Sequence, residues 1–346
     1  MNKIKSNTLE KSGSVNISPK KKLCFYAGMF AVSVIVSVVI LEIFCSLASP
    51  IYITVADYFD NFAVLDEELG YKLVNNFKGL YKQDYELFYS TNSHGLRDHE
   101  FSDFPKEGVK RILAIGDSWT FGPGVEAHQT WPKQLEKILK DKNLDAQVIN
   151  SGVSGYGTRN YNRALRKFYP IYHPDIVIVL TFDNDLGNDI ADSQKVYSAV
   201  TSQDSWLKTF LKRRSHLAKN LWFIYQGFFP EKYGSFYATK LGKSEDMNDE
   251  IIFGYKLQRE ALIEMRNYCM KNNIFLAVAS LPHSQKFHDN IQNLCYKEDI
   301  NFISLQSLPE IKKIAGNNSA GHYNPQGYYH LAKIIADFLE QSGGLK

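Results

Sequence analysis

Apolar residues follow two alternating patterns from residue 111 onward. Short, nearly unbroken apolar runs alternate with longer segments in which apolar positions recur every three or four residues. Unbroken runs are typical of strands covered on both faces of a parallel sheet, and the longer period is typical of helices packed on it. The pattern predicts strands at 111–115, 146–150, 176–181, 274–280 and 301–304, and helices at 131–139, 161–168, 257–270, 290–296 and within 324–339. This order indicates βαβ units.

The last of these helices has the clearest start. Asn324 is a favourable N-cap residue, and Pro325 suits the first helical position. The face predicted to be buried carries Tyr328, Leu331, Ile335 and Phe338.

A third pattern lies near the N-terminus. Residues 1–22 are polar and end in three lysines, and residues 23–47 begin with an apolar stretch about as long as a helix needs to cross a bilayer. We interpret 23–47 as an uncleaved anchor, with the basic tail in the cytoplasm and the chain beyond about Pro50 outside it. A cleaved signal peptide, with a small-x-small site at Ser46-Leu47-Ala48, or a buried core helix would also account for this stretch.

Two further segments interrupt the regular alternation. Residues 51–105 are aromatic and polar, and we expect them to form a lead-in that packs on a main domain at 106–342. Residues 186–250 contain basic and aromatic clusters and are interpreted as an insertion, either a lid over the strand ends, solvated helices or a membrane-surface contact.

The composition limits the classes of protein and the kinds of site that this chain can have. The chain has 346 residues, is 44% hydrophobic and carries a net charge of +3, which is too small to indicate nucleic-acid binding. Cys269 and Cys295 could form a disulfide or remain buried thiols. The aspartates at 183, 185, 189 and 192 lack the spacing of a calcium loop, so no metal or cofactor is expected.

The candidate chemistry begins with Gly116-Asp117-Ser118, which directly follows the first predicted strand. A serine at the carboxyl end of a parallel strand can act as a nucleophile if a base takes its proton and donors stabilise the oxyanion. Candidate donors follow the next two strands, at Gly155 and Asn184, and a candidate base, His322, precedes the last helix.

In this order, Gly116-Asp117-Ser118, Asn150-x-x-x-x-Gly155, Asp183-Asn184-Asp185 and His322 resemble the SGNH, or GDSL-type, hydrolase superfamily over about residues 90–342. The resemblance implies a three-layer α/β fold with flavodoxin-like winding. It implies that Ser118 is the nucleophile, that His322 is the base, and that the N–H groups of Ser118 and Gly155 and the Asn184 amide form the oxyanion hole. Residues 92–97 also resemble a segment of membrane-anchored bacterial members associated with surface polysaccharide modification.

The chain departs from that family pattern at two positions. Phe182 stands where the family usually has glycine, and Ser319 stands three residues before His322, where the family has the aspartate that orients the base. Three alternatives remain for His322. It could act with Ser118 as a dyad, a carboxylate from elsewhere in the chain could orient it, or the protein could be slow or inactive. Residues that could support the site are Asp117, Asp185 and Ser319. His283 and His288 follow the fourth strand and could approach the site, but we interpret them as surface residues.

These patterns favour a membrane-anchored serine esterase that acts on acyl groups, such as O-acetyl groups of a glycan in the cell envelope. The same acyl-enzyme could pass its acyl group to a sugar hydroxyl, which would make the protein an O-acetyltransferase with a membrane acyltransferase as partner. The patterns are also compatible with a lipase, with a thioesterase, and with a non-catalytic subunit that binds carbohydrate or serves in assembly.

Overall fold

The computed structural model describes residues 18–48, 52–53, 62–82, 86–102, 104–195, 215–218, 221, 247–281, 283–306 and 321–345. Most of the segment predicted as an insertion, and with it the lid and surface-helix interpretations, lies outside these residues.

Five parallel strands form the central sheet. They are β6 (Lys110–Gly116), β7 (Ala146–Asn150), β8 (Ile176–Thr181), β9 (Phe275–Ser280) and β10 (Asn301–Ser304). Their order across the sheet is β10-β9-β8-β6-β7, and every neighbouring pair is parallel. The first strand of the domain therefore lies between the second and third, which is the predicted flavodoxin-like winding.

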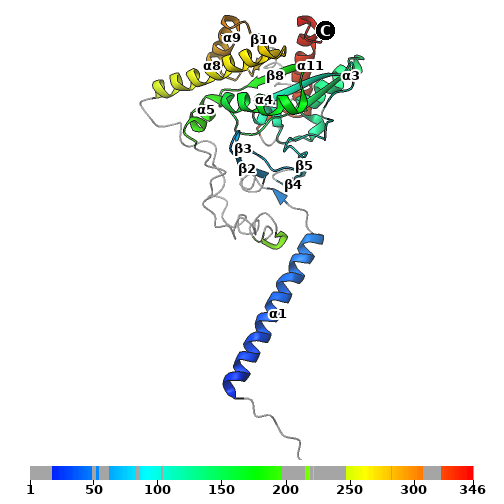
Figure 1. Cartoon of the computed structure of the whole chain (residues 1–346), viewed down its shortest axis with the longest axis vertical. Coiled ribbons are helices and arrows are strands. Elements are labelled where there is room, and N and C mark those ends of the chain that lie inside the picture. The colour runs from blue at the N-terminus through cyan, green and yellow to red at the C-terminus, as the bar shows by residue number, and fades with distance from the viewer. Residues whose placement is uncertain are drawn as a thin grey trace, which may run out of the picture.

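Helices cover both faces of this sheet (Figure 1). One core contains residues of α3 (Trp131–Asp141) and α11 (Pro325–Ser342), and the other contains residues of α4 (Thr158–Tyr172), α8 (Met247–Lys271) and α9 (Gln285–Lys297). Successive residues of β6 enter opposite cores, with Ile112 in the first and Leu113 in the second. This alternation explains why the strands are continuous apolar runs, and the three-layer prediction is confirmed.

The predicted strands agree with the observed ones to within one residue at each end, whereas the helices are longer than predicted. β7, β8 and β10 have the predicted bounds, but α4 begins at Thr158 and α8 begins at Met247. Propensity and periodicity weaken where a helix starts on polar residues, so helix ends are hard to predict. The cap of α11 is as expected, because Asn324 Oδ1 accepts a hydrogen bond from Gly327 N–H at 3.0 Å.

A long helix, α1 (Pro19–Ala48), precedes the domain (Figure 1). Its segment Pro19–Leu47 has a mean hydropathy of 2.6 in its most apolar window, none of which is buried within the protein. Length and composition therefore suit a single membrane span. Near its end, the Glu42 carboxylate accepts hydrogen bonds from Ser215 Oγ and the N–H groups of His216 and Leu217.

The described part of the lead-in consists of short strands. β2 (Ala63–Asp66) and β3 (Gly70–Leu73) form an antiparallel hairpin, and β4 (Lys78–Lys82) pairs with β1 (Tyr52–Ile53) and β5 (Glu86–Ser90). Burial of Phe62, Leu73 and Tyr89 in the same core as α4 joins these strands to the main domain.

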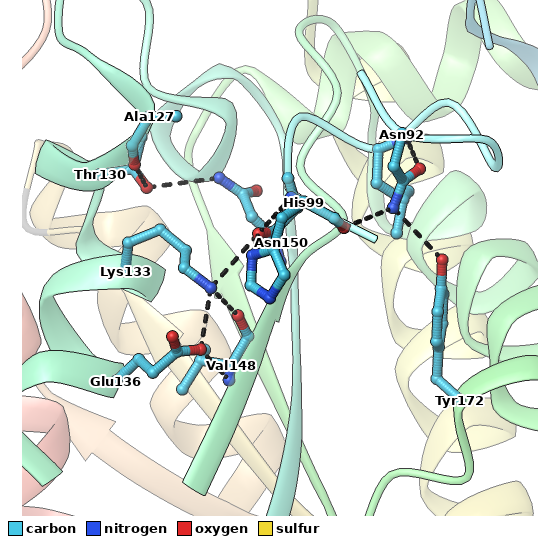
Figure 2. Close-up of polar contacts among 11 residues, drawn as sticks. Asn92, His99, Ala127, Thr130, Lys133, Glu136, Val148, Asn150 and Tyr172 are labelled. Atoms are coloured by element: carbon cyan, nitrogen blue, oxygen red, sulfur yellow. Dashed lines mark hydrogen bonds and ion pairs between the residues drawn. The ribbon is translucent and has the colours of Figure 1, made fainter. Parts of the chain in front are cut away.

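A turn at 92–97 completes this contact. Asn92 Oδ1 accepts from Leu96 N–H at 2.9 Å, and its Nδ2 donates to the His99 carbonyl at 3.1 Å (Figure 2). Gly95 has a φ of +81° and lies so close to the Leu73 carbonyl that a side chain would collide with it. The spacing of Asn and Gly in this motif therefore has a structural cause, a tight turn packed on the hairpin.

Two expectations about buried residues can be checked. Of the two alternatives for Cys269 and Cys295, the structure shows buried free thiols, and burial raises the pKa of each thiol to about 12. His288 was expected at the surface but is buried, with Nδ1 3.3 Å from the Ser280 carbonyl oxygen. It lies on the inner face of α9, against Phe302.

Candidate active site

Ser118 lies where β6 turns into the short helix α2 (Ser118–Phe121). Asp117 caps this helix by accepting a hydrogen bond from Trp119 N–H at 2.9 Å. A Cβ atom on Gly116 would lie 2.2 Å from Thr120 Oγ1, so only glycine fits the end of the strand. The triplet predicted from the sequence is therefore a tight turn that lifts one hydroxyl above the sheet edge.

His322 lies beside that hydroxyl. Its Nε2 is 2.8 Å from Ser118 Oγ, although the two residues are 204 positions apart. The imidazole packs on the Trp119 ring at 4.6 Å, and Tyr323 packs on the same indole at 5.0 Å. The structure thus brings together the predicted nucleophile and base at the distance that proton transfer needs.

Asn184 is the third predicted residue at this edge. It precedes α5 (Asp185–Ser193), and its Nδ2 donates to Asp117 Oδ2 at 3.0 Å. The same carboxylate oxygen is 3.5 Å from Ser118 Oγ. Because a side-chain amide has two N–H bonds, holding one on Asp117 fixes the direction of the other.

Asp117 has an unusual environment for a carboxyl group. Burial raises its pKa to about 6, against the opposing effect of hydrogen bonds from Trp119 N–H and the Asn184 amide. A carboxylate held by neutral donors gains less stabilisation than one beside a cation.

The loop after β7 carries Gly155, the other predicted donor. Val153 N–H donates to the Gly116 carbonyl at 3.1 Å, and a Cβ atom on Gly152 would lie 2.3 Å from Phe121 N. This loop therefore packs directly on the Ser118 turn. Gly155 itself has a φ of +82°, which favours glycine, and among the described residues no hydrogen bond joins it to Ser118.

Of the supporting residues that the sequence suggested, Asp185 lies under the site and does not reach Ser118. It accepts hydrogen bonds from Tyr161 Oη at 2.7 Å and Phe182 N–H at 3.1 Å. Burial, with the nearby charges of Asp117 and Asp189, raises its pKa well above the usual range. Asp185 thus shapes the loop that presents Asn184. Ser319 lies outside the described residues.

The side chain of Arg97 supports the nucleophile turn from the lead-in. It is fully buried and donates to the carbonyls of Phe121 at 2.9 Å, Gly122 at 2.6 Å and Val125 at 2.6 Å. Its guanidinium also lies 4.1 Å from the centre of the Tyr89 ring. The sequence places this residue in a motif but does not reveal its role, since nothing local indicates which carbonyls it binds.

His283 is a surface residue, as expected, and it also has polar and ring contacts near the site. It is exposed, yet its Nδ1 lies 2.6 Å from Asp183 Oδ2, and its ring packs on Phe182 at 5.3 Å. Asp183 and His283 follow the neighbouring strands β8 and β9, which is the one signal by which the sequence could have paired them.

Among the described residues, no group of three or more His, Cys, Asp or Glu side chains could hold a metal ion.

Comparison with known proteins gives one family match. Residues 114–234 match the model of the GDSL-like lipase/acylhydrolase family, a range that includes Ser118, Gly155 and Asn184. An arylesterase of Vibrio mimicus is 29% identical over 79 residues, which are 23% of this chain and 40% of that protein. The match thus spans two fifths of the length of this relative.

Solved structures of esterases are similar to this chain at low identity. A psychrotrophic esterase from Pseudoalteromonas sp., inhibited by monoethylphosphonate, is 14% identical with a TM-score of 0.42, over 67% of this chain and 98% of its own. A family 3 carbohydrate esterase from Clostridium thermocellum is 16% identical with a TM-score of 0.41, over 68% of this chain and 96% of its own.

Proposed function

We propose that this chain, of which residues 114–234 match the GDSL-like lipase/acylhydrolase family, is a membrane-anchored serine esterase that removes acyl groups, in particular O-acetyl groups, from a glycan of the cell envelope. The observation that carries the proposal is the 2.8 Å contact between His322 Nε2 and Ser118 Oγ.

In the proposed reaction, His322 Nε2 takes the proton of Ser118 as Oγ attacks the ester carbonyl carbon. The carbonyl oxygen becomes an oxyanion, which accepts hydrogen bonds from the N–H groups of Ser118 and Gly155 and from the Asn184 amide. His322 then gives its proton to the departing alcohol, and the acyl group remains on Ser118. Water, deprotonated by His322, attacks this acyl-enzyme and releases the acid.

Asp117 has a positioning role in this scheme. Its carboxylate holds one N–H of Asn184 at 3.0 Å, which directs the second N–H toward the oxyanion. Ser118 and Asn184 therefore keep a fixed relation even though they come from different strands.

A fluorophosphonate probe tests the proposal, because it reacts covalently with an activated serine. The full-length chain in detergent should be labelled at Ser118, and Ser118→Ala should not be labelled at all. If the wild-type chain is labelled no more than Ser118→Ala, then it is not a serine esterase.

We also propose how the chain is arranged at the membrane. Residues 1–22 form a cytoplasmic tail, 23–47 cross the bilayer, and the lead-in at 51–105 and the domain at 106–342 lie outside the cytoplasm, since the lysines precede the apolar segment. Protease added to intact spheroplasts should digest the domain and spare the tail. If the domain is digested only after lysis, then the orientation is the opposite of the proposed one.

An O-acetyltransferase would use the same acyl-enzyme, with a sugar hydroxyl in place of water and a membrane acyltransferase supplying the acyl group. The exposed position of His283 beside the site favours this as the second candidate, because an acceptor needs a surface to bind. Release of free acetate without an added sugar supports the esterase, whereas acetate release that requires a sugar acceptor supports the transferase.

A further inference from the structure

A second histidine–carboxylate pair lies on the same edge of the sheet as the catalytic pair. Asp183 follows β8 and His283 follows β9, and Nδ1 of His283 is 2.6 Å from Asp183 Oδ2. Because β8 and β9 are neighbouring parallel strands, both side chains come from the carboxyl edge that also carries Ser118.

Successive ring contacts join this pair to the catalytic histidine. The His322 ring is 4.6 Å from Trp119, Trp119 is 5.1 Å from Phe182, and Phe182 is 5.3 Å from His283. Trp119 is buried, Phe182 is half-buried and the His283 side chain is 59% exposed, so this aromatic row runs from the core to solvent. Phe182 is the residue that replaces the glycine usual in the family.

The chemistry of the site decides which half of the ester meets the aromatic row. His322 must return its proton to the oxygen of the departing alcohol, so that oxygen lies beside Nε2. Since His322 packs on Trp119, the first ring of the row, the row begins beside the position of that oxygen, and Phe182 and His283 continue it toward solvent.

On the basis of the proposed function, we infer that Phe182 and His283 bind the alcohol half of the ester, and that this half is a hydroxylated ring such as a sugar. Phe182 offers an apolar ring to the carbon framework of the ligand. When Nδ1–H of His283 donates to Asp183, Nε2 is left as an acceptor for a hydroxyl. An apolar surface with one oriented polar group suits a ligand that is itself apolar on its face and hydroxylated at its edge.

A similar pair elsewhere shows that the pairing alone does not make a binding site. His99 Nδ1 is 2.8 Å from Asp98 Oδ1, and its side chain is 57% exposed. The Asp98 side chain, however, is only 2% exposed. It also accepts Asn150 N–H and pairs with Lys133, and these contacts join the lead-in to the domain. Asp183 is 27% exposed, and His283 lies at the end of the aromatic row.

The test compares two acetyl esters on the full-length chain in detergent. In 6-O-acetylglucose the alcohol half carries hydroxyls, whereas in p-nitrophenyl acetate it is a ring without hydroxyls. His283→Ala should lower kcat/KM for 6-O-acetylglucose by about 5- to 10-fold through KM, the effect of one hydrogen bond, and leave p-nitrophenyl acetate unchanged. Phe182→Leu should lower kcat/KM for both by about 3-fold, and fluorophosphonate labelling should stay unchanged in both variants.

His99→Ala is the matched control and should leave both substrates unaffected. If His283→Ala lowers kcat/KM equally for both substrates and also lowers labelling, His283 is a structural residue and the inference is wrong. The inference is also wrong if His283→Ala lowers kcat/KM for neither substrate. A labelled chain that hydrolyses p-nitrophenyl acetate but not 6-O-acetylglucose overturns the sugar class alone. A wild-type chain that is neither labelled nor active overturns the proposed function, and the binding site with it.

Discussion

The two edges of the central sheet are held in different ways, although each contains one fully buried arginine. At the amino edge, Arg111 donates to the Tyr172 carbonyl at 2.7 Å, the Ser102 carbonyl at 2.9 Å and Gln147 Oε1 at 2.9 Å. At the carboxyl edge, Arg97 donates to three carbonyls of the turn that follows Ser118. The first arginine joins structural elements, and the second supports a candidate nucleophile.

The carboxyl edge also contains buried carboxyl groups close to the candidate site. At the carboxyl edge, the hydrogen bonds to Asp117 and Asp185 come from neutral donors, and burial raises the pKa of both. Such groups cost stability in their charged form. Because Arg97 and these carboxyl groups surround the candidate site, whereas Arg111 joins structural elements, variants at the two edges should affect different measurements.

The largest expected effect is on catalysis at the carboxyl edge. Replacing His322 with Ala removes the base 2.8 Å from Ser118 Oγ, and we expect kcat/KM for p-nitrophenyl acetate to fall by about 10⁴-fold or more. Thermal unfolding should change little, because only one side chain is shortened. His330→Ala, on the following helix, is the control and should keep full activity; a similar loss there would point to α11 rather than to the base.

The next largest effects come from replacing the two buried arginines, which distinguishes the role of one edge from that of the other. Arg97→Met and Arg111→Met each remove several charged hydrogen bonds from a buried position, so each should lower the free energy of unfolding by about 3 kcal/mol or more. Chemical denaturation of the full-length chain measures this loss.

Only Arg97→Met should also slow fluorophosphonate labelling of the fraction that remains folded, because only its carbonyl partners belong to the Ser118 turn. Equal labelling of both folded variants would show that the turn holds its shape without Arg97.

A double-mutant cycle tests the link between Asp117 and Asn184. Asn184→Ala should lower kcat by about 10²- to 10³-fold, as expected for loss of an oxyanion donor. Asp117→Asn should lower kcat in the wild-type background but add little to Asn184→Ala, because it acts through that amide. Fully additive losses would mean that Asp117 affects Ser118 by another route.

The sequence predicted the strands because they depend on local patterns, and it indicated Ser118 and His322 as a candidate pair through the resemblance of its motifs to a known family. Apolar runs defined β7 and β8 to the residue, and the structure places His322 Nε2 2.8 Å from Ser118 Oγ. The support around them depends on contacts between distant segments. Arg97, for example, meets the Ser118 turn only after the lead-in has folded, so neither spacing nor periodicity could indicate that contact.

The raised pKa values predict that stability depends on pH. The pKa of Asp117 rises from 3.8 to about 6 on folding and that of Asp189 from 3.8 to about 7, so the folded state holds more protons between these values. The free energy of unfolding should therefore fall as pH rises from about 4 to about 7, by up to about 1.4 kcal/mol per pH unit for each group.

Asp117→Asn should make this pH dependence shallower between about pH 4 and pH 6, because the amide has no charged form. Urea denaturation at a series of pH values measures it. A slope identical to that of the wild-type chain would show that other groups set the dependence.

The smallest effect concerns the helix that follows His322. Asn324→Ala removes the hydrogen bond to Gly327 N–H and should lower the free energy of unfolding by about 1 kcal/mol. The cap lies two residues from His322, so the start of α11 also fixes where the histidine loop ends. We therefore expect a loss in kcat of a few-fold on p-nitrophenyl acetate, with partial recovery in Asn324→Asp, which keeps an oxygen acceptor. Reduced stability with unchanged kcat would show that the start of α11 does not position the base.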